Sequence, residues 1–212
     1  MNDDDTLIGR LAGDLRPIRA QRARTGWGLL VLAILATGIG VHALFGPWPG
    51  TVHAEGGAWS AVGGALLAVL GMACAHAVVG MASPRRVGRP AAFWIVIAAS
   101  VMPLAAVVLL LAPGVGGESL ARVHGHWECA LLGTLSGALV AVALVYWLRR
   151  GAPASPARAG LYAGIATGAL GSAIYGLACP VTGFGHWSTW HFVPVLVCAL
   201  VGRFLLPRFL RW

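Results

Sequence analysis

Arginine residues divide this chain more sharply than any other feature. The chain has fifteen arginines and no lysine, and fourteen of the arginines occupy alternate segments between six long apolar runs. The runs cover residues 27–45, 59–82, 91–112, 127–148, 159–178 and 190–206. At 1.5 Å per residue, a helix of this length crosses a hydrocarbon layer of about 30 Å. We therefore expect an all-α polytopic membrane protein with six transmembrane helices.

The same arginines predict the orientation of the helices. They gather in the leader, in the second and fourth loops and in the tail, whereas the first and fifth loops have none and the third has only Arg122. Because arginine-rich loops stay on the cytoplasmic side, we expect both termini in the cytoplasm. Residues 1–26 then form a cytoplasmic N-terminal segment, and residues 27–212 form a six-helix transmembrane domain in a bacterial inner membrane.

Composition agrees with a chain surrounded by lipid. Hydrophobic residues make up 58% of the chain and charged residues only 10%, which excludes a soluble protein. The net charge of +8 reflects the orientation signal, so we expect no direct nucleic-acid partner. Tryptophans near the ends of runs are expected at the headgroup level, where their amphipathic rings are favoured. They are Trp27, Trp48, Trp59, Trp94, Trp127, Trp147, Trp187 and Trp190.

The leader has the pattern of a short amphipathic helix. Thr6 can cap a helix that runs to about Leu15, before Pro17. Its apolar face would consist of Leu7, Ile8, Leu11 and Leu15. Such a helix either lies on the inner leaflet or docks into a groove of a cytoplasmic protein. The acidic run Asp3–Asp5 favours docking, because anionic lipid would repel it.

Small residues predict close packing between two of the spans. The fifth run has glycines at four-residue spacing, and the fourth run has a similar pair; they are Gly160, Gly164, Gly168, Gly133 and Gly137. Flat glycine faces let helix backbones approach closely in a membrane. We therefore expect the fourth and fifth spans to form a tight antiparallel pair. Prolines inside the third and sixth spans, Pro103 and Pro194, are expected to kink those helices.

Histidine and cysteine gather on the predicted outer side. The candidate ligands are Cys129, Cys179, His124, His126, His186 and His191. Three chemistries fit them. Thiolates and imidazoles can bind a metal ion such as copper, zinc or cadmium. The two thiols can instead form a redox pair, or a structural disulfide beside histidines that bind nothing.

Several segments, taken in order, resemble one family. They are residues 7–18, the start of the fourth run at Cys129, residues 147–156, the fifth run with Tyr175 ending in Cys179-Pro180, the pair Trp190-His191 and residues 202–212. The chain resembles the six-span anti-sigma factors of the NrsF type, negative regulators of the extracytoplasmic-function sigma factor SigF. It departs from them after Pro180, where relatives tend to have an acidic stretch containing Ser-Pro. His124 and His126 also go beyond the family pattern.

The resemblance implies a membrane-bound regulator with no catalytic residues. Members hold a sigma factor inactive at their cytoplasmic face and release it under heavy-metal stress. Their periplasmic cysteine pair, matched here by Cys129 and Cys179, receives the signal. No obligatory cofactor is implied, although a metal ion can act as the signal. Besides membrane lipid, the expected partner is a SigF-like sigma factor, and the sequence indicates no oligomeric state.

We therefore hypothesise that the leader binds the sigma factor through Leu7, Ile8, Leu11 and Leu15, with Arg10 and Arg16 facing an acidic sigma surface. A metal or oxidant bridging Cys129 and Cys179 would then shift the fourth span against the fifth. The alternatives are a membrane thiol oxidoreductase, a metal transporter or metal-binding protein, and a purely structural partner. The first lacks a C-x-x-C pair, and a transporter usually has an ionisable group at mid-membrane, which these runs lack.

Overall fold

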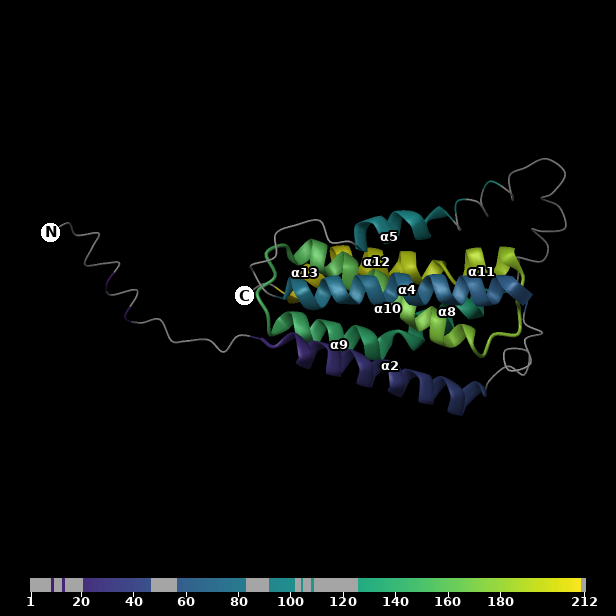
Figure 1. The fold of residues 1–212 in the computed structure, drawn as a ribbon, viewed down its shortest axis with the longest axis horizontal. Helices are drawn as coiled ribbons and strands as arrows, with labels where there is room; N and C mark the ends of the chain where they lie inside the picture. The colour runs from purple at the N-terminus through teal and green to yellow at the C-terminus, as the bar shows by residue number, and fades with distance from the viewer. Residues whose placement is uncertain are drawn as a thin grey trace.

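The computed structural model describes residues 21–46, 57–82, 92–101, 104, 108 and 126–210, together with Gly9 and Gly13. These residues are mostly helical and include no strand, which confirms the all-α prediction for this part of the chain. The long helices lie side by side in one elongated bundle (Figure 1). All six predicted sigma-contacting positions, Leu7, Ile8, Arg10, Leu11, Leu15 and Arg16, lie outside the described residues.

The described helices follow the predicted apolar runs closely. In chain order they are α2 (Ala23–Phe45), α4 (Gly57–Met81), α5 (Ala92–Ala99), α8 (Trp127–Ser136), α9 (Ala138–Arg149), α10 (Pro156–Gly176), α11 (Phe184–Trp190), α12 (Val193–Phe204) and α13 (Leu206–Phe209).

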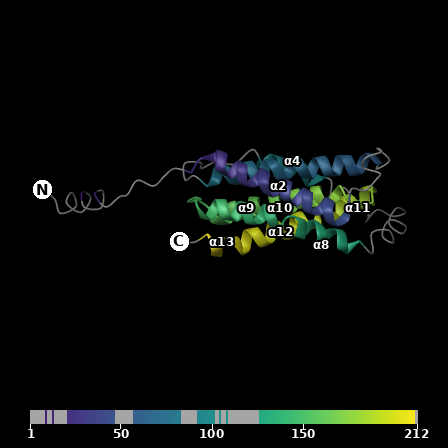
Figure 2. The same cartoon turned by 90° about the horizontal axis from the view of Figure 1, so that it is seen from below.

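Helix α10 forms the centre of the bundle. It contacts α2, α4, α8, α9 and α12, with α4 on one side and α8 and α12 on the other (Figure 2). The helix begins where the Ser155 side chain accepts a hydrogen bond from the Arg158 backbone N–H, with Pro156 at its start. Its residues are mainly glycine and alanine, and most are buried. Small side chains let helices approach α10 from several sides, which suits a central position.

Three of the glycines of α10 face α12 rather than the fourth span, with which close packing was predicted. A Cβ atom on Gly160, Gly164 or Gly168 would collide with backbone carbonyl oxygens of α12, so this face packs on the last long helix. Helix α8 meets α10 on another face, where a Cβ atom on Gly171 would collide with the backbone at Gly133 and Gly137. The predicted close pairing of the fourth and fifth spans is therefore present on this second face. The contact with α12 was not predicted, because glycine spacing along one helix does not identify the helix that packs on it.

Among the described residues, three of the six predicted spans are helices long and apolar enough to cross a membrane. They are Ala23–Phe45, Ser60–Met81 and Trp127–Arg149, the last combining α8 and α9. The third predicted span is described mainly over α5, and Pro103 lies outside the described residues. Helix α10 has 21 residues, but its glycines and Arg158 make it less hydrophobic than those three.

The sixth predicted span is interrupted rather than continuous. Helix α11 ends at Trp190, a turn follows at His191 and Phe192, and α12 begins at Val193. Pro194 lies in the first turn of α12, where its missing N–H leaves no helical hydrogen bond unmade. A second proline, Pro207, accompanies the step from α12 to α13. The kink expected at Pro194 is therefore a break just before it.

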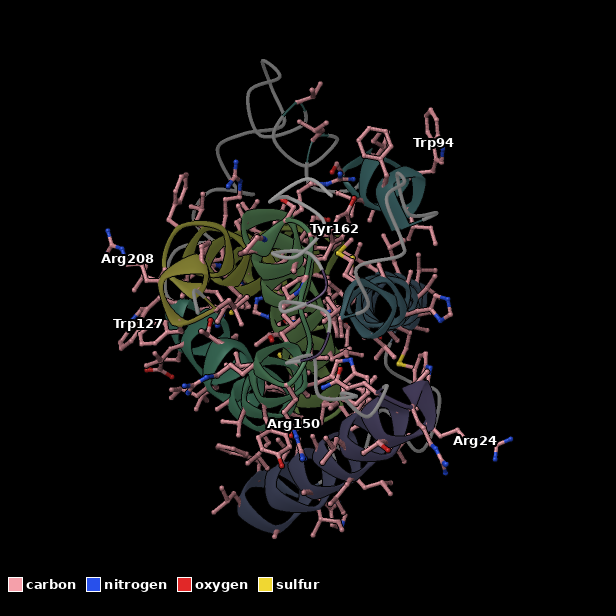
Figure 3. The ribbon with its side chains drawn as sticks, turned by 90° about the vertical axis from the view of Figure 1, so that its left-hand side faces the viewer. Arg24, Trp94, Trp127, Arg150, Tyr162 and Arg208 are labelled. Atoms are coloured by element: carbon pink, nitrogen blue, oxygen red, sulfur yellow. The ribbon has the colours of Figure 1, made fainter. Side chains whose placement is uncertain are left out.

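The described arginines lie toward one end of the bundle. Arg24 is in the first turn of α2 and Arg158 in the first turn of α10. Arg149 ends α9 and Arg150 follows it, and Arg203 and Arg208 lie near the end of α12 and in α13. Figure 3 looks at this end, where the side chains of Arg24 and Arg208 project away from the bundle and Tyr162 lies among the helices. The turn between α10 and α11 is at the opposite end (Figure 1).

Two predicted interfacial tryptophans are instead buried. Trp147 is 3% exposed and donates its indole N–H to the Val79 carbonyl at 3.3 Å, and Trp187 is 2% exposed. Trp94 and Trp127 are 67% and 58% exposed, as side chains in an interfacial belt would be. The prediction was wrong for the first pair because a tryptophan at a helix end can equally fill a gap between helices.

Candidate functional site

The two predicted signal-sensing cysteines lie together at the end of the bundle opposite the arginines. Cys129 is in the first turn of α8, and Cys179 follows the last turn of α10. Their sulfur atoms are 3.9 Å apart, and both thiols are free. Because α10 runs antiparallel to the α8–α9 segment, residues fifty positions apart meet at the same level.

His186 joins the cysteines from α11. Its Nε2 atom is 3.4 Å from the Cys179 sulfur. The two sulfurs and one nitrogen of these three side chains all lie within 4.8 Å of one another. Cys129, Cys179 and His186 are 8%, 2% and 5% exposed, so the cluster is enclosed by protein. We call these three residues the Cys2His cluster.

The chain after α10 folds back so that α11 covers the cysteines. The last turn continues past Gly176, where the Cys179 backbone N–H donates to the Gly176 carbonyl. Trp187 then ties α11 to this turn, because its indole N–H donates to the Val181 carbonyl at 3.0 Å. The Trp187 ring fits against Gly63 and Gly176, where any Cβ atom would meet it. Glycine at both positions therefore makes room for the ring that positions α11.

His191 is the most deeply buried of the predicted site residues, at 0% exposure. Its Nδ1 atom is 3.1 Å from the Ser172 hydroxyl, and the same hydroxyl donates to the His191 carbonyl at 2.8 Å. The imidazole stacks on Trp187 with ring centroids 4.0 Å apart. Its ring centroid lies 5.2 Å from that of His186. His191 thus contacts the His186 ring, but it contributes none of the three clustered ligand atoms.

The remaining predicted ligands differ in what the structure describes. His126 precedes α8, and its ring meets His186 edge to face with centroids 5.1 Å apart. His124 lies outside the described residues. Within the described part of the chain, His186 Nδ1, His191 Nε2 and the Ser188 hydroxyl are buried without a hydrogen-bond partner.

The electrostatic surroundings of the Cys2His cluster are largely neutral. Glu128, beside it in α8, is exposed and is the only acidic residue among those described. The hydrogen bond between the sulfurs, followed by burial, raises the pKa of the Cys179 thiol above its ordinary value. The two cysteines therefore do not ionise independently: a proton held on Cys179 can be shared with Cys129. Such a pair can bind a soft metal ion or close to a disulfide.

Ser172 and the supporting role of Trp187 were missed from sequence. Ser172 lies in the fifth apolar run, where a lone serine is unremarkable unless a buried partner is known. Trp187 was interpreted as an interfacial anchor. The closely spaced aromatic and histidine residues between His186 and His191 were the available signal, because a short segment this rich in rings can pack on itself.

Comparison with known proteins gives a family match over nearly the whole chain. The family described as "NrsF: Negative regulator of sigma F" matches residues 11–212. The anti-sigma-F factor NrsF of Caulobacter vibrioides is 33% identical over 96 residues, covering 44% of this chain and 45% of that protein. The probable anti-sigma-F factor NrsF of Azospira oryzae is 33% identical over 87 residues, covering 41% of each.

These pairwise matches span less than half the length of the curated relatives. No solved structure matches the chain significantly. The family match, in contrast, includes all the described helices and both clustered cysteines. This chain therefore belongs to the NrsF family of negative regulators of sigma F.

Proposed function

We propose that this protein is a membrane-embedded anti-sigma factor that sequesters a SigF-like extracytoplasmic-function sigma factor. A heavy-metal or redox signal at the cysteine pair on the periplasmic side would release it. The observation that carries the proposal is the family match over residues 11–212, since two relatives are named anti-sigma-F factors. The positions of two groups of side chains along the bundle also support the proposal. The described arginines lie toward one end, and the Cys2His cluster lies at the other.

The proposed topology has six spans, with both termini in the cytoplasm. Three helices support it by length and hydropathy. Helix α10 is enclosed by its neighbours, so it needs little lipid-facing hydrophobic surface to occupy the bilayer. Helices α12 and α13 both contact α10, and together they would form the sixth passage. The arginine-rich end of the bundle would then face the cytoplasm, because arginine-rich loops of membrane proteins stay on that side.

The sigma factor would bind at the arginine-rich end and along the leader. Exposed guanidinium groups on Arg24, Arg150 and Arg208 offer positive charge to an acidic protein surface. The leader would contribute the apolar anchors Leu7, Ile8, Leu11 and Leu15. Charge would then orient the partner, and apolar burial would supply most of the affinity.

The signal has to move one end of the bundle relative to the other. Joining Cys129 and Cys179 through a metal or a disulfide ties the start of α8 to the end of α10. Those helices meet with their backbones in contact at Gly133, Gly137 and Gly171, where small shifts cannot be absorbed by flexible side chains. A nearly complete switch requires a differential binding energy of about 5.5 kcal/mol. Metal–thiolate bonds can supply that amount.

Deletion of residues 1–20 tests the sigma-binding part of this proposal. Membranes containing the deleted protein are expected to retain no sigma factor, and the sigma-dependent genes are expected to be constitutively active. The matched control is the double substitution Cys129→Ser and Cys179→Ser, which should keep the sigma factor bound but remove its release by cadmium or oxidant. Retention of the sigma factor by the deleted protein would refute the role of the leader.

A membrane thiol oxidoreductase is the second candidate, favoured by a histidine nitrogen 3.4 Å from a cysteine sulfur. An imidazole at that distance can take the thiol proton and generate the thiolate that attacks a disulfide. This function predicts multiple turnover of a disulfide substrate by the purified protein, and loss of turnover in Cys179→Ser. A single round of oxidation without turnover favours the sensor.

A further inference from the structure

We infer that His186 is the third ligand of a metal site formed with Cys129 and Cys179, and that this site takes a thiophilic divalent cation of the zinc or cadmium kind. The inference deepens the proposed function, on which it rests for the role of the cysteine pair as signal receiver. It adds a ligand, a coordination type and a class of ion.

The spacing of the three ligand atoms matches tetrahedral coordination. Zinc lies about 2.3 Å from sulfur and about 2.0–2.1 Å from nitrogen, which separates two sulfurs by about 3.8 Å and a sulfur from a nitrogen by about 3.6 Å. The observed separations are 3.9 Å between the sulfurs and 3.4 Å between Cys179 Sγ and His186 Nε2. The third pair is no more than 4.8 Å apart, so tetrahedral coordination requires a shift of at most about 1.2 Å between those two atoms.

The same geometry is less suited to a disulfide. A sulfur–sulfur bond is about 2.05 Å long, so the two sulfurs would have to approach by about 1.9 Å. Cys129 lies in the first turn of α8 and Cys179 in the turn after α10, so this approach requires both thiol side chains to move. An ion between the sulfurs requires almost no change in their separation. Metal binding is therefore the smaller perturbation of this end of the bundle.

Charge balance selects a divalent ion. In the described part of the chain, no carboxylate or guanidinium group hydrogen-bonds to Cys129, Cys179 or His186. When the ion binds, each thiol releases its proton to solvent, the imidazole binds as the neutral form, and no electron is transferred. Two thiolates and a divalent cation sum to zero charge, which is the arrangement that burial penalises least. Thiolate ligands also exclude magnesium and calcium, which prefer oxygen.

The surroundings of His186 hold its ring in place. Trp187, next to it in α11, is fixed to the turn by its hydrogen bond to Val181 and packs on Gly63 and Gly176. The rings of His191 and His126 contact the His186 ring edge to face from two directions. A ligand whose orientation is fixed before binding loses little freedom on coordination, and the metal affinity rises accordingly.

The test is titration of the purified, reduced full-length protein in detergent with cadmium ions. Wild-type protein should bind one ion and develop the sulfur-to-cadmium charge-transfer absorption. His186→Asn keeps both thiols and should raise the cadmium Kd about 10–100-fold or more, since even partners of metal ligands contribute that much. His76→Asn, an exposed histidine on α4, is the matched control and should bind as wild type does. Magnesium should not compete.

His186→Cys separates loss of a ligand from loss of folding. It replaces one good ligand by another, so it should restore tight binding with a stronger charge-transfer band from a third thiolate. Equal cadmium affinity in wild type and His186→Asn would overturn the assignment, as would absence of cadmium binding to the reduced wild-type protein.

Release of a bound sigma factor, measured in the same samples, separates this inference from the proposed function. Weakened binding in His186→Asn supports the metal site even if cadmium never releases the sigma factor, which would count against the anti-sigma mechanism alone. Conversely, if the sigma factor is released equally in His186→Asn and wild type with unchanged affinity, the sensor mechanism survives and the role of His186 is refuted.

Discussion

At the scale of single residues, the end of the bundle that holds the Cys2His cluster has buried polar groups that must find hydrogen-bond partners among apolar helices. The Ser172 hydroxyl faces both His191 Nδ1 and the His191 carbonyl, at a point where the chain leaves α11 and has not yet begun α12. A carbonyl freed by a helix break needs a partner when it is buried. Ser172 supplies it, and the break can persist inside the protein.

Substitution Ser172→Ala is expected to lower the free energy of unfolding by about 1–3 kcal/mol, because it removes the hydroxyl that donates to the buried His191 carbonyl and faces His191 Nδ1. Ser188→Ala is the matched control, since Ser188 is 2% exposed and its hydroxyl has no hydrogen-bond partner among the described residues. Its removal should be neutral or stabilising. Unfolding of both variants in the same detergent measures the difference, and equal stability would contradict the role given to Ser172.

At the scale of elements, α10 packs against its neighbours backbone to backbone. The Gly160, Gly164 and Gly168 face touches α12, and the face around Gly171 touches α8. In a membrane no hydrophobic effect drives helices together, so close van der Waals contact between backbones has to do so. The arrangement makes α10 the element through which a change at the cysteines reaches both α8 and α12.

Substitution Gly164→Ala is expected to destabilise the protein by about 1–3 kcal/mol, because the new methyl group meets the backbone of Cys198 and Ala199, which cannot rotate away. Gly38→Ala in α2 is the control. A Cβ atom there meets nothing within 4 Å, and alanine is the better helix former. It should leave stability unchanged or slightly increased. Chemical denaturation of both variants tests this, and tolerance of alanine at position 164 would show that α12 can move away from α10.

At the scale of the whole molecule, charge and sulfur chemistry are separated along the bundle. The described arginines lie toward one end and the Cys2His cluster at the other (Figures 1 and 3). A signal that enters at one end can be read at the other only through helices that span the distance. Helix α10 links them directly, since it begins near Arg158 and ends near Cys179.

Reporter fusions test whether α10, which links the two ends of the bundle, crosses the membrane. Alkaline phosphatase, which is active only outside the cytoplasm, should be inactive when fused after Ala152, between α9 and α10. It should be active when fused after Gly183, between α10 and α11, because α10 lies between the two points. Activity at both positions, or at neither, would contradict a transmembrane α10 and the six-span topology with it.

Most of the described long helices could be predicted from sequence, because the features that indicate them are local to each segment of the chain. Helix length, apolar composition and arginine placement are properties of consecutive residues, so the runs that became α2, α4, α8–α9 and α10 were found within a few residues. The antiparallel pairing expected for the fourth and fifth spans agrees with the position of the cysteines. In such a pair the start of one helix lies beside the end of the other, and the sulfurs there are 3.9 Å apart.

Only the tertiary structure shows which helix faces pack against each other. Glycine spacing identified a flat face on the fifth run but could not assign it to α12, and tryptophan position could not separate the exposed Trp127 from the buried Trp187. The selection of His186 over His191 as the neighbour of the sulfurs depends on the break after Trp190 and on Ser172 stabilising it. Sequence alone determined which residues are helical and which end of a helix they occupy, because hydropathy and charge act locally. Which side chains meet depends on packing among helices far apart in the chain.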